Sequence, residues 1–221
     1  MTIDADGFGP EAISKQINVS RETFERIEAV LACLDQYRKR MNLIGPAEWD
    51  HIWQRHVADS LRLVPYVPMD AHIVDLGSGG GFPALPLACV LTAMGTGHVT
   101  MVETVGKKAT FLRAAVDAAD LNATVRQGRV ENVSDIKADI VTARAFAPLP
   151  KLFDYAEPWL KNDAIGLFHK GERWKEELTA ASKEWTFGYE AIPERDGGSG
   201  IILKVSEVTR GRTQNEDTGG C

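Results

Sequence analysis

The sequence predicts an α/β protein with a mostly parallel seven-stranded sheet, a terminal antiparallel hairpin and an N-terminal helical extension. Five short apolar runs alternate with helix-like segments through the middle of the chain, which is typical of a parallel sheet covered on both faces. Two further strand-like runs near the C-terminus are joined through Gly197-Gly198-Ser199-Gly200. Apolar residues spaced near 3.6 residues apart precede the first strand and predict helices there.

The N-terminal part is predicted to be helical from Ser20 onwards, and the residues before it a loop or a short helix. Ser20 can cap a helix that runs to about Met41, with acids early and Arg38-Lys39-Arg40 at its end. Pro46 suits the first turn of a second helix that ends near Val64. Prolines at 65 and 68 then mark a boundary. We therefore expect an extension over 1–65, the main domain over 66–208 and a disordered tail over 209–221.

The main domain follows from the alternation of patterns. The expected strands are His72–Leu76, Gly97–Glu103, Thr124–Gln127, Asp139–Ala143, Ala164–His169, Trp185–Ile192 and Ile201–Val208. The expected helices are Leu85–Met94, Gly106–Asp120, Leu149–Leu160 and Glu172–Glu184.

Composition limits the class of protein. The chain has 221 residues, 44% of them hydrophobic, and no 20-residue apolar run, so we expect a soluble protein. The acidic first ten residues resemble neither a secretory signal nor a transit peptide, which favours the cytoplasm. Three widely spaced cysteines predict neither a disulfide framework nor a metal site. A net charge of −6 does not exclude a local basic site for nucleic acid. We expect a monomer that binds no membrane.

A glycine-rich turn after the first strand is the main candidate for ligand binding. Gly77, Gly79 and Gly81 follow an apolar run that ends in Asp75, as expected where the backbone bends under a ligand. Glu103 ends the second strand, at a spacing where an acid can accept hydrogen bonds from both ribose hydroxyls. These features predict a ligand that contains a nucleoside. The alternative for Glu103 is a helix-capping or surface acid.

The same turn fits more than one cofactor. Residues 79–84 satisfy the loose G-x-G-x-x-A fingerprint of dinucleotide-binding proteins. However, Pro83 and Pro86 supply no N–H donors where a pyrophosphate would need them. This favours a ligand without a pyrophosphate, such as S-adenosylmethionine. The loop has no Walker-type lysine, and no nucleophilic triad or dyad is evident, so phosphoryl and acyl transfer are poorly supported.

Several motifs together resemble the ribosomal RNA small subunit methyltransferase G family, also called glucose-inhibited division protein B. They are Asn42-Leu43-Ile44, Arg55-His56-Val57-Ala58-Asp59-Ser60-Leu61, Asp75-Leu76-Gly77-Ser78-Gly79-Gly80-Gly81-Phe82-Pro83, Val105-Gly106-Lys107-Lys108, Arg129-Val130-Glu131 and Thr142-Ala143-Arg144-Ala145. The resemblance covers roughly residues 40–171. The last glycine usual for the loop motif is Ala84 here.

The resemblance implies a Rossmann-like class I methyltransferase fold, S-adenosylmethionine as methyl donor, and methylation of N7 of the guanine at position 527 of 16S rRNA. It places cofactor contacts at Gly77, Phe82, Val130, Glu131 and Arg144, to which the residue patterns add Gly79 and Glu103. Guanine N7 carries an in-plane lone pair and no proton, so in-line methyl transfer needs no general base. We therefore assign no catalytic acid or base and no metal ligand, and expect positioning to supply catalysis.

Basic residues at helix and strand ends are the candidates for contact with 16S rRNA or the 30S subunit. They are Arg55, His56, Lys107, Lys108, Arg144 and Lys170. The alternatives are solvated surface charges and, for His56, a structural histidine. Three other functions stay open: a methyltransferase acting on a small molecule, a nicotinamide-dependent dehydrogenase, and an RNA-binding module that binds cofactor without transferring methyl.

Overall fold

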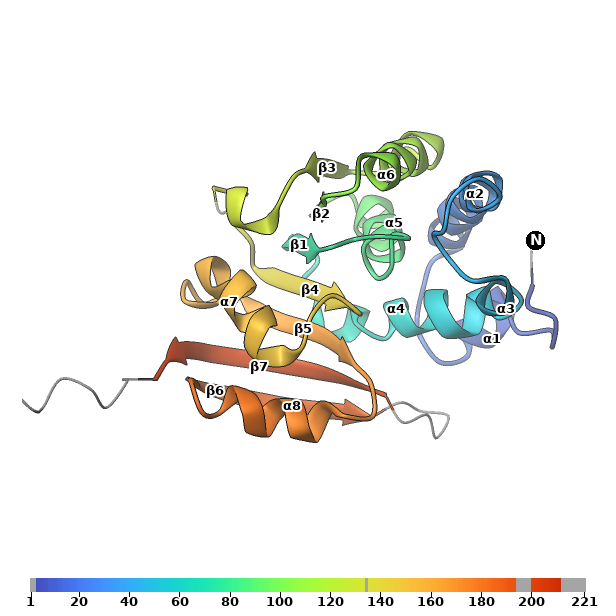
Figure 1. The fold of residues 1–221 in the computed structure, drawn as a ribbon. Helices are drawn as coiled ribbons and strands as arrows, with labels where there is room; N and C mark the ends of the chain where they lie inside the picture. The colour runs from blue at the N-terminus through green and yellow to red at the C-terminus, as the bar shows by residue number, and fades with distance from the viewer. Residues whose placement is uncertain (1–2, 134, 194–199, 212–221) are drawn as a thin grey trace, which may run out of the picture.

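A computed structural model describes residues 3–133, 135–193 and 200–211 (Figure 1). Its centre is a seven-stranded sheet in the order β3-β2-β1-β4-β5-β7-β6. Strands β1 to β5 pair in parallel, whereas β7 is antiparallel to β5 and β6 is antiparallel to β7. The predicted sheet is therefore confirmed. The strands are β1 His72–Leu76, β2 His98–Glu103, β3 Ala123–Gln127, β4 Ile140–Arg144, β5 Ile165–Lys170, β6 Trp185–Pro193 and β7 Ile201–Arg210.

The C-terminal end of the chain differs slightly from the prediction. Strand β7 continues through Thr209 and Arg210, which were expected in the tail, because both still pair with β6. Residues 212–221 of the predicted tail and 197–199 of the predicted hairpin turn lie outside the described residues.

The main-domain helices begin and end close to their predicted limits. They are α5 Ala84–Met94, α6 Gly106–Ala118, α7 Leu149–Leu160 and α8 Trp174–Ala181. A short 3-10 turn, η3 Val130–Asn132, follows β3. Among the described residues, none of the helices has the length and apolar character needed to cross a bilayer.

Two apolar layers cover the two faces of the sheet. Along β1, Ile73 belongs to one buried cluster and Val74 to the other, because successive strand residues point to opposite faces. Helices α5 and α6 pack on the first face, and α7 and α8 cover the second. The site at the strand ends is thus held by a sheet that is buried on both sides.

The N-terminal region packs into the first of these layers. It begins with α1 Pro10–Ser14 and α2 Arg21–Arg38. The Ser20 side chain accepts a hydrogen bond from the Thr23 N–H, which confirms the predicted cap. The predicted apolar face of α2 is buried at Ile27 and Leu34 and packs on α5 and α6. Figure 1 shows α2 lying beside these helices. The 1–65 boundary stays a prediction, although one apolar cluster spans it.

The second N-terminal helix is not continuous, and the single helix predicted from Pro46 to Val64 is wrong. It is divided into α3 Pro46–Trp49, a π-helical turn η1 Trp53–Ala58, α4 Asp59–Leu61 and a 3-10 turn η2 Val64–Tyr66. The buried Asp4 carboxylate accepts hydrogen bonds from the N–H groups of Trp53 and Gln54, both at 2.9 Å. An acid distant in sequence therefore occupies the donors at the start of η1, as an N-cap does.

Candidate functional site

The glycine turn predicted from the sequence lies at the carboxyl end of β1, where parallel sheets bind ligands. The N–H groups of Gly77 and Ser78 both donate to the Val102 carbonyl, at 2.9 and 3.1 Å, and so tie the turn to β2. Gly77 and Gly79 have φ of 68° and 52°, a left-handed conformation that favours glycine. The sequence-predicted turn is present and held by backbone contacts.

Glu103 lies at this turn, as predicted. One carboxylate oxygen accepts from the Gly79 N–H at 2.8 Å and the other from the Val105 N–H at 2.7 Å, and the residue is 5% exposed. Val105 is the N-cap residue of α6, but α6 has no side-chain cap hydrogen bond, so Glu103 does not perform the capping role that was its alternative. The carboxylate joins the turns after β1 and β2, where hydroxyl groups of a ligand could reach it.

Asp75 is a candidate to which the sequence motifs assigned no role of its own. Its Oδ1 accepts from the Thr142 hydroxyl at 2.7 Å, whereas Oδ2 has no hydrogen-bond partner among the described residues. Burial raises the pKa of Asp75 to about 6, against the lowering effect of the nearby Ser78 and Thr142 hydroxyls, of which Ser78 donates to the Asp75 backbone carbonyl at 3.2 Å. A buried acceptor without a partner beside the glycine turn fits a ligand that brings a positively charged or N–H group. The signal in the sequence was an acid ending an apolar strand.

The remaining predicted cofactor residues lie around the same edge but differ in exposure. Phe82 is buried, with its ring 5.0 Å from that of His56, so its side chain belongs to the core. Val130 is buried in η3 and Glu131 is exposed beside it. The Gly128 N–H donates to the Glu103 carbonyl at 3.0 Å, which brings the start of this segment to the end of β2.

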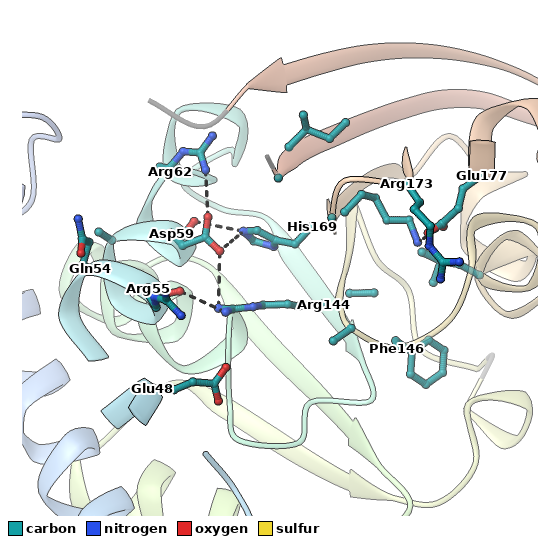
Figure 2. Close-up of a pocket in the computed structure, with 18 of the residues that line it drawn as sticks. Glu48, Gln54, Arg55, Asp59, Arg62, Arg144, Phe146, His169, Arg173 and Glu177 are labelled. Atoms are coloured by element: carbon teal, nitrogen blue, oxygen red, sulfur yellow. Dashed lines mark hydrogen bonds and ion pairs between the residues drawn. The ribbon is translucent and has the colours of Figure 1, made fainter. Parts of the chain in front are cut away.

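A cavity of about 940 Å³ lies next to the turn, beyond the ends of β4 and β5 (Figure 2). Its walls come from the β4–α7 loop, from the end of β5, and from the N-terminal region through α1 and η1. Arg55, Arg144 and Lys170 line it together, as their positions at helix and strand ends predicted. The charged residues on its walls are Glu48, Arg55, Asp59, Arg62, Arg144, Lys170, Arg173 and Glu177.

One carboxylate organises the basic residues of this cavity. Asp59 lies 3.6 Å from Arg144, 3.0 Å from Arg62 and 3.4 Å from the His169 Nε2. Dashed lines mark these contacts in Figure 2. Arg144 also donates to the Arg55 carbonyl at 3.1 Å. Asp59 therefore fixes Arg144 at the cavity wall. The sequence patterns gave neither Asp59 nor His169 a role, since charge alone does not reveal which residues meet.

Burial controls the charge of the two histidines near this network. It lowers the pKa of His169, as does the Arg144 charge, against the opposing effect of Asp59. It lowers the pKa of His56 to about 4, again with a contribution from Arg144. Both imidazoles are therefore neutral at pH 7. The histidines therefore add no positive charge beside Arg144, whose guanidinium pairs with the Asp59 carboxylate.

Two predicted RNA-binding residues are not free at the surface. His56 is 6% exposed and packs on Phe82, which removes its ring from direct RNA contact. Lys170 is 9% exposed, lies 2.6 Å from Glu177, and donates to the Ala147 carbonyl at 2.9 Å. Glu177 and the Ala147 carbonyl thus occupy the Lys170 ammonium, whereas the buried Nε2 of His56 has no hydrogen-bond partner among the described residues.

The other predicted RNA contacts are accessible. The Arg55 side chain is exposed at the cavity. Lys107 is exposed and Lys108 partly exposed in the first turn of α6, directly after β2. Basic groups thus stand on both sides of the glycine turn: Arg55 and Arg144 towards β4, and the two lysines towards β2.

Comparison with known sequences identifies relatives over most of the chain. Residues 23–193 match the GidB family, described as rRNA small subunit methyltransferase G. A protein of Hyphomonas neptunium named ribosomal RNA small subunit methyltransferase G is 60% identical over 193 residues, covering 87% of this chain and 92% of the relative. A protein of the same name from Paramagnetospirillum magneticum is 41% identical over 207 residues, covering 93% and 99%.

Solved structures with low sequence identity share the fold. A Podospora anserina methyltransferase, solved with SAH bound, has a TM-score of 0.60 at 11% identity and covers 89% of this chain and 92% of its own. An O-methyltransferase from Bacillus cereus, also in complex with SAH, has a TM-score of 0.56 at 15% identity, covering 89% and 96%. The class I methyltransferase fold is thus shown by structure and the family by sequence: the chain belongs to the rRNA small subunit methyltransferase G family.

Proposed function

We propose that this protein is an S-adenosylmethionine-dependent methyltransferase that modifies N7 of the guanine at position 527 of 16S rRNA. The observation that carries the proposal is the glycine turn tied to Glu103, directly beside a cavity of about 940 Å³ lined with basic residues. Family membership supports the reaction, since the relatives are named as rRNA methyltransferases. N7 and position 527 come from the motif resemblance. We further propose that the enzyme works in the cytoplasm as a monomer.

The turn residues fit the proposed methyl donor. When bound, S-adenosylmethionine would supply a methyl group on a positively charged sulfur. Gly79 leaves room for close backbone approach, whereas the space beside Gly77 is filled by the Phe146 ring. Glu103 can accept from ribose hydroxyls, and the unpaired Asp75 oxygen can accept from an amino group. Val130 and Glu131 would border the base of the ligand. Pro83, at the start of α5, still argues against a pyrophosphate there.

Positioning is the proposed source of catalysis. Guanine N7 has no proton to remove, so the site needs to align the two reactants rather than to activate one. Arg144, fixed by Asp59, and the exposed Arg55 would hold the RNA on the cavity side. Lys107 and Lys108 would hold phosphates on the other side of the turn. The buried His56 and Lys170 would act through the groups they support.

One experiment separates this function from its alternatives. The protein is incubated with methyl-labelled S-adenosylmethionine and with 30S subunits, free 16S rRNA or a small-molecule pool, and the label is mapped. Label on guanine N7 at position 527 is the expected result. Label only in the small-molecule pool would identify a different methyltransferase, and cofactor binding without any label would leave a binding module.

A further inference from the structure

Phe146 lies between the glycine turn and the cavity. Its ring packs so closely on Gly77 that a β-carbon on that glycine would overlap ring atoms of Phe146. The same residue is only partly buried and lines the cavity. Figure 2 labels its side chain among the lining residues. One aromatic side chain therefore contacts the predicted cofactor loop and also borders the space proposed for RNA.

The loop that carries Phe146 is held in place on both sides. Preceding it, Ala145 has φ of 51°, which is uncommon for a residue other than glycine. Following it, the Ala147 carbonyl accepts from Lys170, and Glu177 accepts from the Leu149 N–H at 2.8 Å while pairing with Lys170. An ion pair between the buried Lys170 and the partly exposed Glu177 thus fixes the loop. The buried position of Lys170 is explained by this support.

An aromatic ring between the glycine turn and the cavity suits the chemistry of the proposed reaction. The new bond forms between N7 and the methyl carbon, and the bond between that carbon and sulfur breaks, leaving its electron pair on sulfur. Positive charge therefore moves from sulfur to the purine ring. An aromatic face attracts a cation and also stacks with a base. Since the charge on the purine is larger in the transition state than in the substrate, part of this attraction would favour reaction rather than binding alone.

We infer that Phe146 is a positioning residue on which the target guanine stacks, at the boundary between the glycine turn and the cavity. This inference rests on the proposed function and assigns the cavity to a single purine nucleotide turned out of the RNA. Tyr155 lies behind the ring, with centroids 5.3 Å apart and planes at 60°, and limits its movement. The ring is thereby presented as a fixed surface.

The test compares Phe146→Leu, which keeps an apolar side chain but removes the aromatic face, with Phe146→Trp, which keeps an aromatic face. Stacking of one base is generally worth about 1–3 kcal/mol, or roughly five- to hundredfold. We expect Phe146→Leu to lower single-turnover methylation of RNA by about that factor, with S-adenosylmethionine affinity within about threefold of wild type. Phe146→Trp should recover most of the rate. Phe187→Leu is the matched control, since Phe187 is also partly buried but packs on Phe153 away from the cavity.

A binding measurement gives a second readout that does not depend on turnover. Guanosine monophosphate and its cationic N7-methyl form are titrated against wild type, Phe146→Leu and Phe187→Leu. Wild type and the control should prefer the cationic nucleotide, and Phe146→Leu should lose that preference. Equal nucleotide preference in all three proteins, or a full methylation rate in folded Phe146→Leu, would overturn the inference while leaving the proposed function intact. No methylation of guanine by wild type would remove both.

Discussion

The two halves of the site are formed by different chemical groups. The half beside β1 and β2 is made of backbone: a glycine turn, two N–H groups on one carbonyl, and a carboxylate that binds further N–H groups. The half beside β4 and β5 is made of charged side chains gathered around Asp59. The first can specify a small ligand through shape, whereas the second can hold a polyanion through charge. Substitutions in the two halves should therefore have separable effects.

Gly77→Val should have the largest effect. The new side chain would overlap the Phe146 ring and would need a left-handed backbone that β-branched residues resist. We expect S-adenosylmethionine binding, measured by calorimetry, to be lost in a protein that remains folded by circular dichroism. Gly79→Ala is the control: its β-carbon meets only the Gly77 carbonyl at 3.6 Å, so backbone strain of about 1–2 kcal/mol should weaken binding roughly tenfold. Unchanged affinity in Gly77→Val would refute the backbone half of the comparison.

Asp59→Asn should break the charged half. It leaves Arg62 and Arg144 without their common counter-charge in a largely buried setting, which typically costs about 3–5 kcal/mol of unfolding free energy. Urea titration measures the loss. Asp154→Asn provides a control, because its pair with Arg210 is more exposed and should be worth less than about 1 kcal/mol. Comparable losses of unfolding free energy in both variants would show that the Asp59 cluster stabilises the protein no more than an exposed ion pair does.

Two buried groups near the site, Asp75 and His56, should have opposite effects on the free energy of unfolding as the pH changes. The Asp75 pKa, about 6, lies above its usual 3.8, so the stability it contributes falls as pH rises between these values. The His56 pKa, about 4, lies below its usual 6.5, so its contribution falls as pH drops through that range. Each change amounts to about 3 kcal/mol. The two contributions should therefore nearly cancel between pH 4 and 6.

Single substitutions should reveal the separate pH dependences of the unfolding free energy that cancel in the wild type. Asp75→Asn is expected to steepen the loss of unfolding free energy on acidification from pH 6.5 to 4, and to raise stability at pH 7. His56→Asn should instead give a protein that becomes more stable as pH falls from 6 to 4. Urea titrations at several pH values measure both. Parallel pH profiles for the two variants would contradict the opposing assignment.

Lys107→Glu with Lys108→Glu should give the smallest effect. The proposed cofactor site lies on the backbone half, so cofactor affinity should stay within about twofold, while RNA binding weakens about tenfold. The slope of log affinity against log salt should fall by roughly one for each phosphate that the protein no longer neutralises. Lys161→Glu with Lys183→Glu makes the same change in total charge at two other exposed sites. If both double variants weaken RNA binding equally, net charge rather than position is responsible.

The backbone half could be predicted from the sequence, because its signals are local. An apolar run, alternating glycines and an acid ending the next strand lie within 31 residues, from Ile73 to Glu103. Periodicity also placed all seven strands, since each strand has its own apolar pattern. These features depend on neighbours in the chain.

The charged half could not be predicted in the same way, because its partners are distant in sequence. Asp59 meets Arg144 and His169, and no local pattern indicates which charges will meet. The break before Trp53 depends on Asp4, which stands 49 residues earlier. Lys170 was predicted as an accessible basic residue at a strand end, but its ammonium is buried and pairs with Glu177 and the Ala147 carbonyl. Such contacts follow from tertiary packing.

The apolar cluster that spans α2, α5 and the first face of the sheet has a consequence for local unfolding. Since α2 buries Ile27, Val30 and Leu34 in the same core as Leu87 of α5, opening it would expose the interior of the sheet as well. The amide protons of α2 should therefore exchange with solvent only through the openings that also release those of β1. The N-terminal segment would then belong to the same cooperative folding unit as the strand that ends at the glycine turn.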